Sequence, residues 1–191
     1  MGKSRYSRIL TASLLIALVV GVVGGWALSR SSDDADVNSS PTTIGGFPTN
    51  DDNAGKPFPF VELTNLDGEA VTLSATENRP MVVNFWFSTC IPCKREMPVL
   101  AEAAAEYESR VDFVGINPND TSSAARDFLD KYGVTYPNYL DDGDQTAAAG
   151  VATMPATFFL SADGTIIARK AGEVTADELT EYLTTLVSEG T

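Results

Sequence analysis

The stretch MVVNFWFSTCIPC, residues 81–93, joins an apolar run to the only two cysteines in the chain. Met81–Phe87 favours a strand buried on both faces, and the run Met97–Tyr107 beyond the cysteines favours a helix. Two cysteines separated by two residues at the start of a helix lie within one turn, close enough to form a disulfide. The unpaired N–H groups of a helix N-terminus also stabilise the thiolate form of cysteine. This placement predicts thiol–disulfide redox chemistry at Cys90 and Cys93.

Two other interpretations of the cysteine pair are weaker. A structural zinc site needs about four cysteine or histidine ligands, and this chain has no histidine and no third cysteine. A purely structural disulfide over so short a loop would constrain the unfolded chain little. We therefore expect a redox-active pair, with neither a metal ion nor another cofactor.

Composition limits what the chain can be. Its 191 residues, 43% of them hydrophobic, are enough for one well-packed domain with additional segments. The net charge of -13 is unevenly distributed, because residues 1–30 hold four basic and no acidic residues. The acidic remainder repels phosphate backbones, and no basic, aromatic patch is visible. The sequence therefore excludes nucleic acid as a partner, and the acidic surface favours solubility or the selection of basic partner proteins.

The N-terminal segment predicts a membrane anchor. Leu10–Leu28 carries no charge and would span about 28 Å as a helix, close to the roughly 30 Å hydrocarbon core of a bilayer. Three basic residues precede it and acids follow it, so the positive-inside rule places residues 1–9 in the cytoplasm and the rest outside. The cysteines then face an oxidising space. The alternative is a signal peptide cleaved at Ala27-Leu28-Ser29, although the apolar part of such peptides is usually shorter, about 7 to 15 residues.

Two further segments follow the predicted anchor. Residues 29–56 are dominated by Ser, Asp, Thr, Asn, Gly and Pro, with too few apolar residues to bury a core. We expect a disordered tether there, with an end-to-end distance of roughly 30 Å. The globular pattern begins near Phe58, so residues 57–191 are expected to form one domain.

Strand and helix patterns alternate within this domain. A hairpin is predicted first, with strands over Phe60–Thr64 and Ala70–Leu73 around an Asp-Gly turn. The elements predicted after the cysteine helix are a strand over Val111–Ile116, helices over Ser122–Tyr132 and Asp144–Ala149, a hairpin of Thr157–Leu160 with Thr165–Ala168, and a last helix that begins at Thr175. This order favours an α/β fold in which helices cover both faces of a mixed sheet.

Two separated stretches resemble the membrane-tethered thioredoxin-like proteins of the TlpA and ResA type. The first is NFWFSTCIPCKREMP at Asn84–Pro98, and the second is GVATMPATFFL at Gly150–Leu160, followed by Asp163-Gly164. The resemblance covers about Pro57–Val187. It implies a thioredoxin fold with an added N-terminal β-hairpin, a cis proline at Pro155 that lies against the disulfide, and thiol–disulfide oxidoreductase activity outside the cytoplasm.

The same resemblance indicates which residues meet a substrate. Family members commonly carry Trp before the first cysteine, where this chain has Thr89, and a smaller or β-branched residue before the cis proline, where this chain has Met154. Both departures alter the surface that faces a substrate and leave the cysteine chemistry intact. We expect Trp86, Thr89, Met154 and Pro155 to form the substrate-binding rim, with Trp86 either beside the disulfide or within the core of its strand.

Three residues are candidates for catalysis. Cys90 is the predicted nucleophile because the first cysteine is exposed at the helix end, and Cys93, one turn deeper, resolves the mixed disulfide. Glu96 shares a helical face with Cys93. By resemblance to the ResA-type proteins it would be a partly buried carboxylate that moves protons to the cysteines, and otherwise it is an acid offsetting the helix dipole. Asn84 stands where many cytosolic thioredoxins have a buried aspartate, so Glu96 is the remaining candidate proton acceptor.

These features predict a membrane-anchored thiol–disulfide oxidoreductase, most simply a reductant of exported proteins such as apocytochrome c before haem attachment. Ile91 and Pro92 place no cation between the cysteines, which favours a reductant, whereas Lys94 and Arg95 favour the opposite direction. The expected partners are exported thiol or disulfide proteins and a membrane electron donor or acceptor. The alternatives are an exported oxidase of the same fold, a non-enzymatic binding module, and a peroxiredoxin-like peroxidase, although Phe87 stands where a peroxidase of that kind needs Thr or Ser.

Overall fold

The computed structural model describes residues 42–44, 47–49, 53–75 and 79–189. The strands and helices, in chain order, are β1 (Thr42–Ile44), β2 (Phe47–Thr49), β3 (Glu62–Asn65), β4 (Ala70–Thr72), β5 (Met81–Phe85), α2 (Ile91–Glu106), β6 (Asp112–Asn117), α3 (Ser122–Tyr132), β7 (Asn138–Leu140), α4 (Asp144–Ala148), β8 (Ala156–Leu160), β9 (Ile166–Ala171) and α5 (Ala176–Glu189). Residues 1–9 and the predicted membrane helix over 10–28 lie outside the described residues. Within the described ranges, no helix is both long and apolar enough to cross a bilayer.

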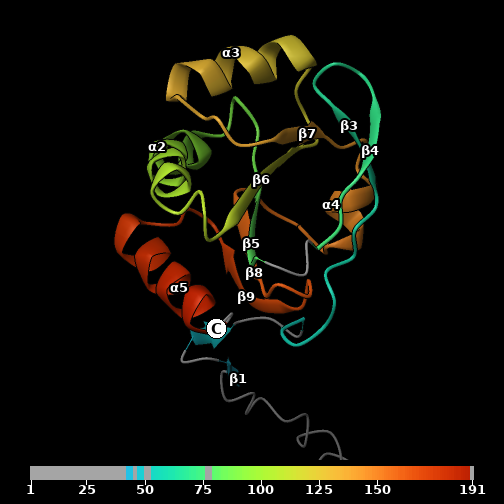
Figure 1. The fold of residues 1–191 in the computed structure, drawn as a ribbon. Coiled ribbons are helices and arrows are strands. Elements are labelled where there is room, and N and C mark those ends of the chain that lie inside the picture. The colour runs from blue at the N-terminus through green and yellow to red at the C-terminus, as the bar shows by residue number, and fades with distance from the viewer. Residues whose placement is uncertain (1–41, 45–46, 50–52, 76–78, 190–191) are drawn as a thin grey trace, which may run out of the picture. The chain divides into compact units, whose positions relative to one another are not determined.

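Seven strands form one mixed sheet (Figure 1), in the order β4-β3-β7-β6-β5-β8-β9. β5, β6 and β7 run parallel to one another, whereas β8 and β9 at one edge and β3 and β4 at the other are paired antiparallel. The sheet and its added hairpin β3–β4 confirm the predicted fold class, a thioredoxin fold with an N-terminal hairpin. β1 and β2 form a separate antiparallel pair inside residues 29–56, for which the sequence predicts a tether.

The central strand β5 determines which residues lie under the cysteine helix. All of its residues are buried, and successive side chains of a strand point to opposite faces of the sheet. Val82 and Asn84 face α2, where Val82 packs with Leu100 and Asn84 bonds to a side chain of the helix. The alternate residues Met81, Val83 and Phe85 pack on the opposite face. Asn84 is therefore the one polar side chain that β5 directs towards α2.

Helices cover both faces of the sheet, as the sequence predicts. Figure 1 shows α2 and α5 side by side over one face, with α4 on the other side of the sheet. Buried apolar residues between the sheet and the pair α2 and α5 include Val82, Leu100, Phe113, Phe159, Leu179, Leu183 and Leu186. The opposite face is filled by residues that include Phe58, Leu63, Val83, Phe85, Val114, Ile116, Phe158 and Leu160. Each such side chain contributes about 1.5–3 kcal/mol when it is fully buried, so these two layers stabilise the sheet that carries the cysteines.

The ends of the helices follow local sequence rules. α2 begins directly after Cys90, whose Sγ accepts a hydrogen bond of 3.2 Å from the backbone N–H of Cys93. Pro92 occupies the first turn, where its missing N–H breaks no helical hydrogen bond. α3 ends at Gly133, which adopts φ +67, a conformation that glycine accepts without strain. The predicted opening of a helix by the cysteine pair is thus confirmed.

One strand of the sheet is absent from the sequence prediction. β7 pairs in parallel with β6 and antiparallel with β3, so it joins the added hairpin to the central strands. Its three residues are too few to show a strand pattern. Both predicted hairpins, β3–β4 and β8–β9, are confirmed. β3 begins at Glu62, two residues later than the expected Phe60.

Candidate active site

Cys90 and Cys93 form a disulfide at the N-terminal end of α2. Their Cα atoms are 5.2 Å apart. Cys90 is 6% exposed, whereas Cys93 is fully buried. Cys90 is therefore the sulfur that a protein substrate reaches more easily. Its role as nucleophile and that of Cys93 as the resolving cysteine stay predictions.

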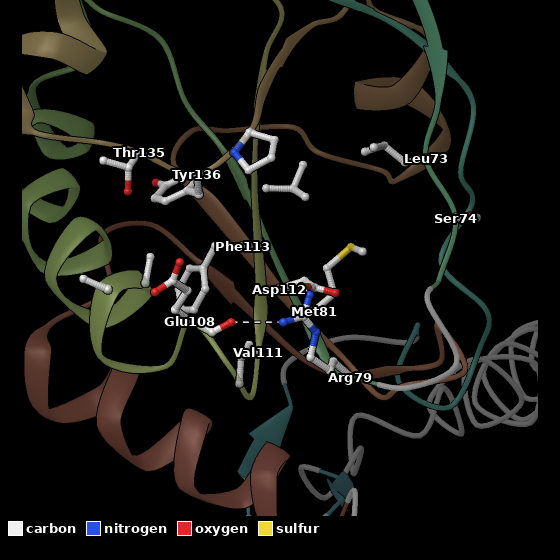
Figure 2. Close-up of a pocket in the computed structure, with 14 residues that line it drawn as sticks. Leu73, Ser74, Arg79, Met81, Glu108, Val111, Asp112, Phe113, Thr135 and Tyr136 are labelled. Carbon is white, nitrogen blue, oxygen red and sulfur yellow. Dashed lines mark hydrogen bonds and ion pairs between the residues drawn. The ribbon is translucent and has the colours of Figure 1, made fainter.

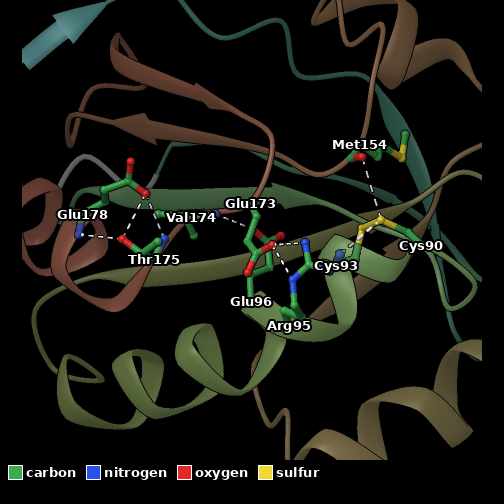
Figure 3. Close-up of polar contacts among 9 residues, drawn as sticks. All are labelled: Cys90, Cys93, Arg95, Glu96, Met154, Glu173, Val174, Thr175 and Glu178. Atoms are coloured by element: carbon green, nitrogen blue, oxygen red, sulfur yellow. Dashed lines mark hydrogen bonds and ion pairs between the residues drawn. A yellow bond between two sulfur atoms is a disulfide. The ribbon is translucent and has the colours of Figure 1, made fainter.

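The segment before β8 lies against the disulfide. The Met154–Pro155 peptide bond is cis, as the sequence resemblance implies. Cys90 Sγ lies 3.8 Å from the carbonyl oxygen of Met154 (Figure 3). In the reduced protein this carbonyl would face the Cys90 thiol as a hydrogen-bond acceptor. Two stretches more than sixty residues apart thus meet at the reactive sulfur.

The predicted substrate rim is exposed in part. Thr89 is exposed, Met154 is half-buried and Pro155 is buried. Ile91, between the two cysteines, is 67% exposed and is the only exposed large hydrophobic residue in the described part of the chain. The exposed Ile91 side chain provides apolar surface next to Cys90. Substrate contact by these residues stays a prediction.

Trp86 lies in the layer beneath the disulfide. It is fully buried in a cluster that contains both cysteines, and its ring stacks on Phe128 of α3 with 4.7 Å between the ring centroids. Its Nε1 donates a hydrogen bond of 2.9 Å to Asn138 Oδ1 in β7. Gly115 makes room for this bond, because a Cβ there would lie 1.8 Å from Asn138 Oδ1. Trp86 is therefore a core residue that supports the site from below, and its predicted contact with a substrate stays a prediction.

Glu96 is a buried carboxyl on the sheet-facing side of α2. Its side chain is fully inaccessible to solvent. Oε1 accepts a hydrogen bond of 2.8 Å from Asn84 Nδ2, and Oε2 accepts one of 2.9 Å from the backbone N–H of Val174. Asn84 Nδ2 also donates to Thr157 Oγ1 at 3.0 Å, while Asn84 Oδ1 accepts no hydrogen bond from the described residues. Glu96 is thus held within the core, and the alternative of a solvated first-turn acid is wrong.

Burial changes the acidity of Glu96. Loss of hydration raises its pKa from 4.5 to about 7, and the hydrogen bonds from Val174 and Asn84 oppose that change by stabilising the charged form. A general acid–base group works best when its pKa lies near the working pH. The Glu96 carboxyl therefore lies one helical turn beyond Cys93 and can gain and lose a proton near neutral pH.

The sequence does not single out Asp120, which holds the loop before Cys90. The Asp120 carboxylate accepts hydrogen bonds from Ser88 N at 2.6 Å and from Ser88 Oγ at 2.8 Å. Asn117 Nδ2 donates to the same carboxylate at 2.7 Å. Asn117-Pro118-Asn119-Asp120 before a helix is typical of a turn, and that composition is the only available signal. Val174 contributes a backbone N–H from 78 residues away, for which a sequence carries no signal.

A pocket of about 620 Å³ lies away from the cysteines (Figure 2). It opens between the C-terminal part of α2 and the first residues of β5 and β6, and its lining residues include Arg79, Phe113 and Tyr136. Neither cysteine, Glu96 nor Pro155 lines it. The redox chemistry is therefore carried by the surface around Cys90 rather than by this pocket. In the described part of the chain, no cluster of side chains is suited to hold a metal ion.

Comparison with protein families agrees with this geometry. The Redoxin family model matches residues 53–186. Over 131 residues the chain is 30% identical to the thiol–disulfide oxidoreductase ResA of Bacillus thuringiensis strain Al Hakam, covering 68% of this chain and 76% of the relative. The ResA of Oceanobacillus iheyensis is 30% identical over 184 residues, covering 95% of this chain and 90% of the relative.

Solved structures with similar folds include two mycobacterial proteins. A structure of MTB dsbF in its mixed oxidised and reduced forms has a TM-score of 0.61 and 32% identity, covering 66% of this chain and 94% of the other. A secreted Mycobacterium tuberculosis disulfide oxidoreductase, homologous to E. coli DsbE, has a TM-score of 0.59 and 31% identity, covering 66% and 96%.

Proposed function

Because the chain belongs to the Redoxin family and is a thiol–disulfide oxidoreductase of the ResA type, we propose that it works outside the cytoplasm as a membrane-anchored reductant of exported proteins. The observation that carries this proposal is the Cys90–Cys93 disulfide at the start of α2, with Glu96 buried one turn beyond it. The proposed substrate is the disulfide of apocytochrome c, which must be reduced before haem attachment.

Reduction proceeds by two thiol–disulfide exchanges. The Cys90 thiolate attacks one sulfur of the substrate disulfide, which forms a mixed disulfide and releases one substrate thiolate. The Cys93 thiolate then attacks Cys90 Sγ, so the second substrate sulfur leaves and the Cys90–Cys93 disulfide forms. Two electrons pass to the substrate, whose sulfurs take up two protons. A membrane electron donor then reduces Cys90–Cys93 again.

Glu96 serves the proton transfers of this cycle. Cys93 is buried and must lose its thiol proton inside the protein before it can attack. Glu96 lies on the same buried side of α2, and its pKa of about 7 allows it to accept that proton at neutral pH. The proton role therefore rests on burial and position rather than on exposure to solvent.

The surroundings of the pair support the reducing direction. A couple becomes oxidising when its reduced, thiolate form is stabilised. Ionised Glu96 opposes a second negative charge on a nearby cysteine, and Arg95, a basic residue near the helix start, is bonded to Glu173. Both features disfavour the thiolate and so favour a reductant over an oxidase of the same fold.

The reduction potential of the purified protein tests the direction. After equilibration in redox buffers we expect a value closer to about -270 mV, as for thioredoxin, than to about -120 mV, as for a strong oxidant. A peptide that contains an oxidised C-x-x-C-H haem attachment motif should be reduced by the dithiol protein. A potential near that of the strong oxidant would contradict the proposed reducing direction and favour an oxidase of the same fold.

Trapping of substrates tests the assigned roles. Cys93→Ser should accumulate mixed disulfides with exported proteins, because attack by Cys90 remains possible while resolution does not. Cys90→Ser should accumulate none. Equal trapping by the two variants would contradict the assignment.

The proposed location rests on the sequence of the N-terminal segment and on the secreted mycobacterial neighbour. A membrane-impermeant thiol reagent should label reduced Cys90 in intact cells, and the protein should stay with membranes in a high-salt wash. Release of a soluble form that begins near Arg30 would show cleavage of a signal peptide instead.

A further inference from the structure

A short turn connects three parts of the active site. Residues 172–174 lie between β9 and α5. The backbone N–H of Gly172 donates to the carbonyl oxygen of the cis proline, Pro155, at 2.8 Å. Two residues later, the N–H of Val174 donates to Glu96 Oε2 at 2.9 Å. The backbone of one turn therefore contacts both the proline beside the disulfide and the buried carboxyl.

The turn is fastened at both ends. Arg95 of α2 forms an ion pair with Glu173, in which Arg95 Nε donates to Glu173 Oε2 at 2.7 Å (Figure 3). On the other side, Glu178 of α5 accepts from the N–H of Thr175 at 2.9 Å, and Thr175 Oγ1 accepts from the N–H of Glu178 at 3.3 Å. This reciprocal pair is a capping box at the start of α5. The position of Val174 is thus set by contacts to two helices.

We propose that the turn 172–174, fastened to α2 by the Arg95–Glu173 ion pair, is a positioning element that holds the Val174 N–H on the Glu96 carboxyl and controls its protonation. Neither Arg95 nor Glu173 bonds to a cysteine in the described part of the chain, so both are positioning residues. This proposal rests on the proposed role of Glu96 in proton transfer. Its test measures the titration of the Glu96 carboxyl directly.

The elements packed around Glu96 contribute several charged, titratable and polar groups. Glu173 in the turn raises the pKa of Glu96, and Lys170 of β9 lowers it. Lys170 is itself bonded to Glu178 of α5 at 2.6 Å. Tyr136, which donates to Met97 Sδ at 3.4 Å, has a raised pKa because of burial and the charge of Glu96. Asn84 and Thr157, from β5 and β8, supply neutral polar groups.

Glu173 acts on Glu96 in two opposite ways. Its charge disfavours ionised Glu96, which raises the pKa of that carboxyl. Its bond to Arg95 keeps the turn in place, so that the Val174 N–H stabilises the ionised form. Arg95 neutralises the charge and secures the turn at the same time. Substitutions at the two positions should therefore shift the pKa of Glu96 in opposite directions, and the Val174 amide reports whether the turn itself has moved.

The test is a pH titration of the Glu96 carboxyl in the oxidised full-length protein, by NMR with carbon-13 at glutamate side-chain carboxyls. Glu96→Gln identifies the signal. Arg95→Gln should move the midpoint to higher pH, because Glu173 loses its partner and the turn loses its fastening. Glu173→Gln should move it to lower pH, since the charge is removed while the Gln amide oxygen still accepts from Arg95. We expect shifts of about a few tenths of a pH unit for so exposed a pair.

Controls separate positioning from a general effect. Arg95→Lys keeps the ion pair and should keep the wild-type midpoint. Arg126→Gln removes another exposed pair, with Asp67 on the added hairpin, and should also leave it unchanged. In Arg95→Gln the Val174 amide should exchange its hydrogen faster than in the wild type.

The outcomes discriminate clearly. Unchanged midpoints in Arg95→Gln and Glu173→Gln, or shifts of the same sign, would overturn the positioning role. Opposite shifts together with faster hydrogen exchange of the Val174 amide in Arg95→Gln support it. Opposite shifts with unchanged amide exchange would show an effect of charge alone and would also overturn the positioning role. If opposite shifts and faster Val174 amide exchange occur while Glu96→Gln leaves the pH profile of disulfide exchange unaltered, the positioning role stands and the proton-transfer role of Glu96 fails.

Discussion

Asn84 Nδ2 donates to Glu96 Oε1 across 2.8 Å, which ties the central strand to the helix that carries both cysteines. Both residues are buried, and the bond spans only 12 residues of sequence. A neutral amide at Asn84 gives the carboxyl a donor without adding a second charge. The buried acid of this site therefore comes from the helix, and the strand supplies its hydrogen bond.

Glu96→Gln should change the pH dependence of disulfide exchange. With the carboxyl gone, we expect the inflection near pH 7 to disappear and the rate at neutral pH to fall by about 100-fold or more, as for loss of an acid–base group. The thiolate absorbance of the reduced protein should titrate at lower pH, because a negative charge near the cysteines is removed. Glu102→Gln, an exposed glutamate on the same helix, is the matched control, and superimposable profiles for the wild type and Glu96→Gln would eliminate the proton role.

The free energy of unfolding of the oxidised protein should depend on pH because of Glu96. The pKa is about 7 in the folded protein and 4.5 without burial, so the folded state holds the proton more tightly. This contribution is complete below about pH 4.5 and is lost as the pH rises through about 7, a decrease on the order of 3 kcal/mol. Urea denaturation across this range, compared with Glu96→Gln, measures the difference. A difference that is constant with pH would contradict the raised pKa.

Asn84→Asp should create a coupled pair of buried carboxyls. The new carboxylate would lie at hydrogen-bond distance from Glu96, where two like charges cannot both be accommodated. We expect the pair to retain one proton at neutral pH. Once both groups ionise, the folded protein should lose about 3 kcal/mol of stability or more. Thermal denaturation between pH 6 and 9 checks this. Asn84→Ala adds no charge and removes only a hydrogen bond to the ionised Glu96, so its loss of stability should grow less with rising pH than that of Asn84→Asp.

Gly115→Ala should destabilise the layer beneath the disulfide. The added Cβ would lie 1.8 Å from Asn138 Oδ1 and 2.8 Å from Trp86 Nε1, so the hydrogen bond between these side chains must break. Overpacking and a buried unpaired indole N–H together should cost about 2–4 kcal/mol in the free energy of unfolding.

A double-mutant cycle tests that explanation. Asn138→Ala removes the atom that the new Cβ would meet, so Gly115→Ala should cost less in its presence than alone. Urea midpoints of the four proteins give the coupling energy. Strict additivity would mean that contact with Asn138 is not the cause.

Local patterns predicted most elements because each has a local cause. The cysteine pair opens α2, since Cys90 accepts the N–H of Cys93 and Pro92 suits a first turn. Gly133 ends α3 where the pattern predicts it. The cis peptide bond at Pro155 follows from resemblance, because local sequence alone favours the trans form. Membrane anchoring and the tether stay predictions, since they fall largely outside the described residues.

By itself, the sequence determined the chemistry and most of the order of elements, without β7: a redox pair between a buried strand and a helix, within an alternating α/β domain. The tertiary structure alone decided the surroundings of that pair. Whether Glu96 was solvated or buried, and which groups meet it, depended on contacts with β5 and with the turn after β9, up to 78 residues away. Periodicity and capping act within a few residues, whereas desolvation and ion pairing depend on which distant segments pack together.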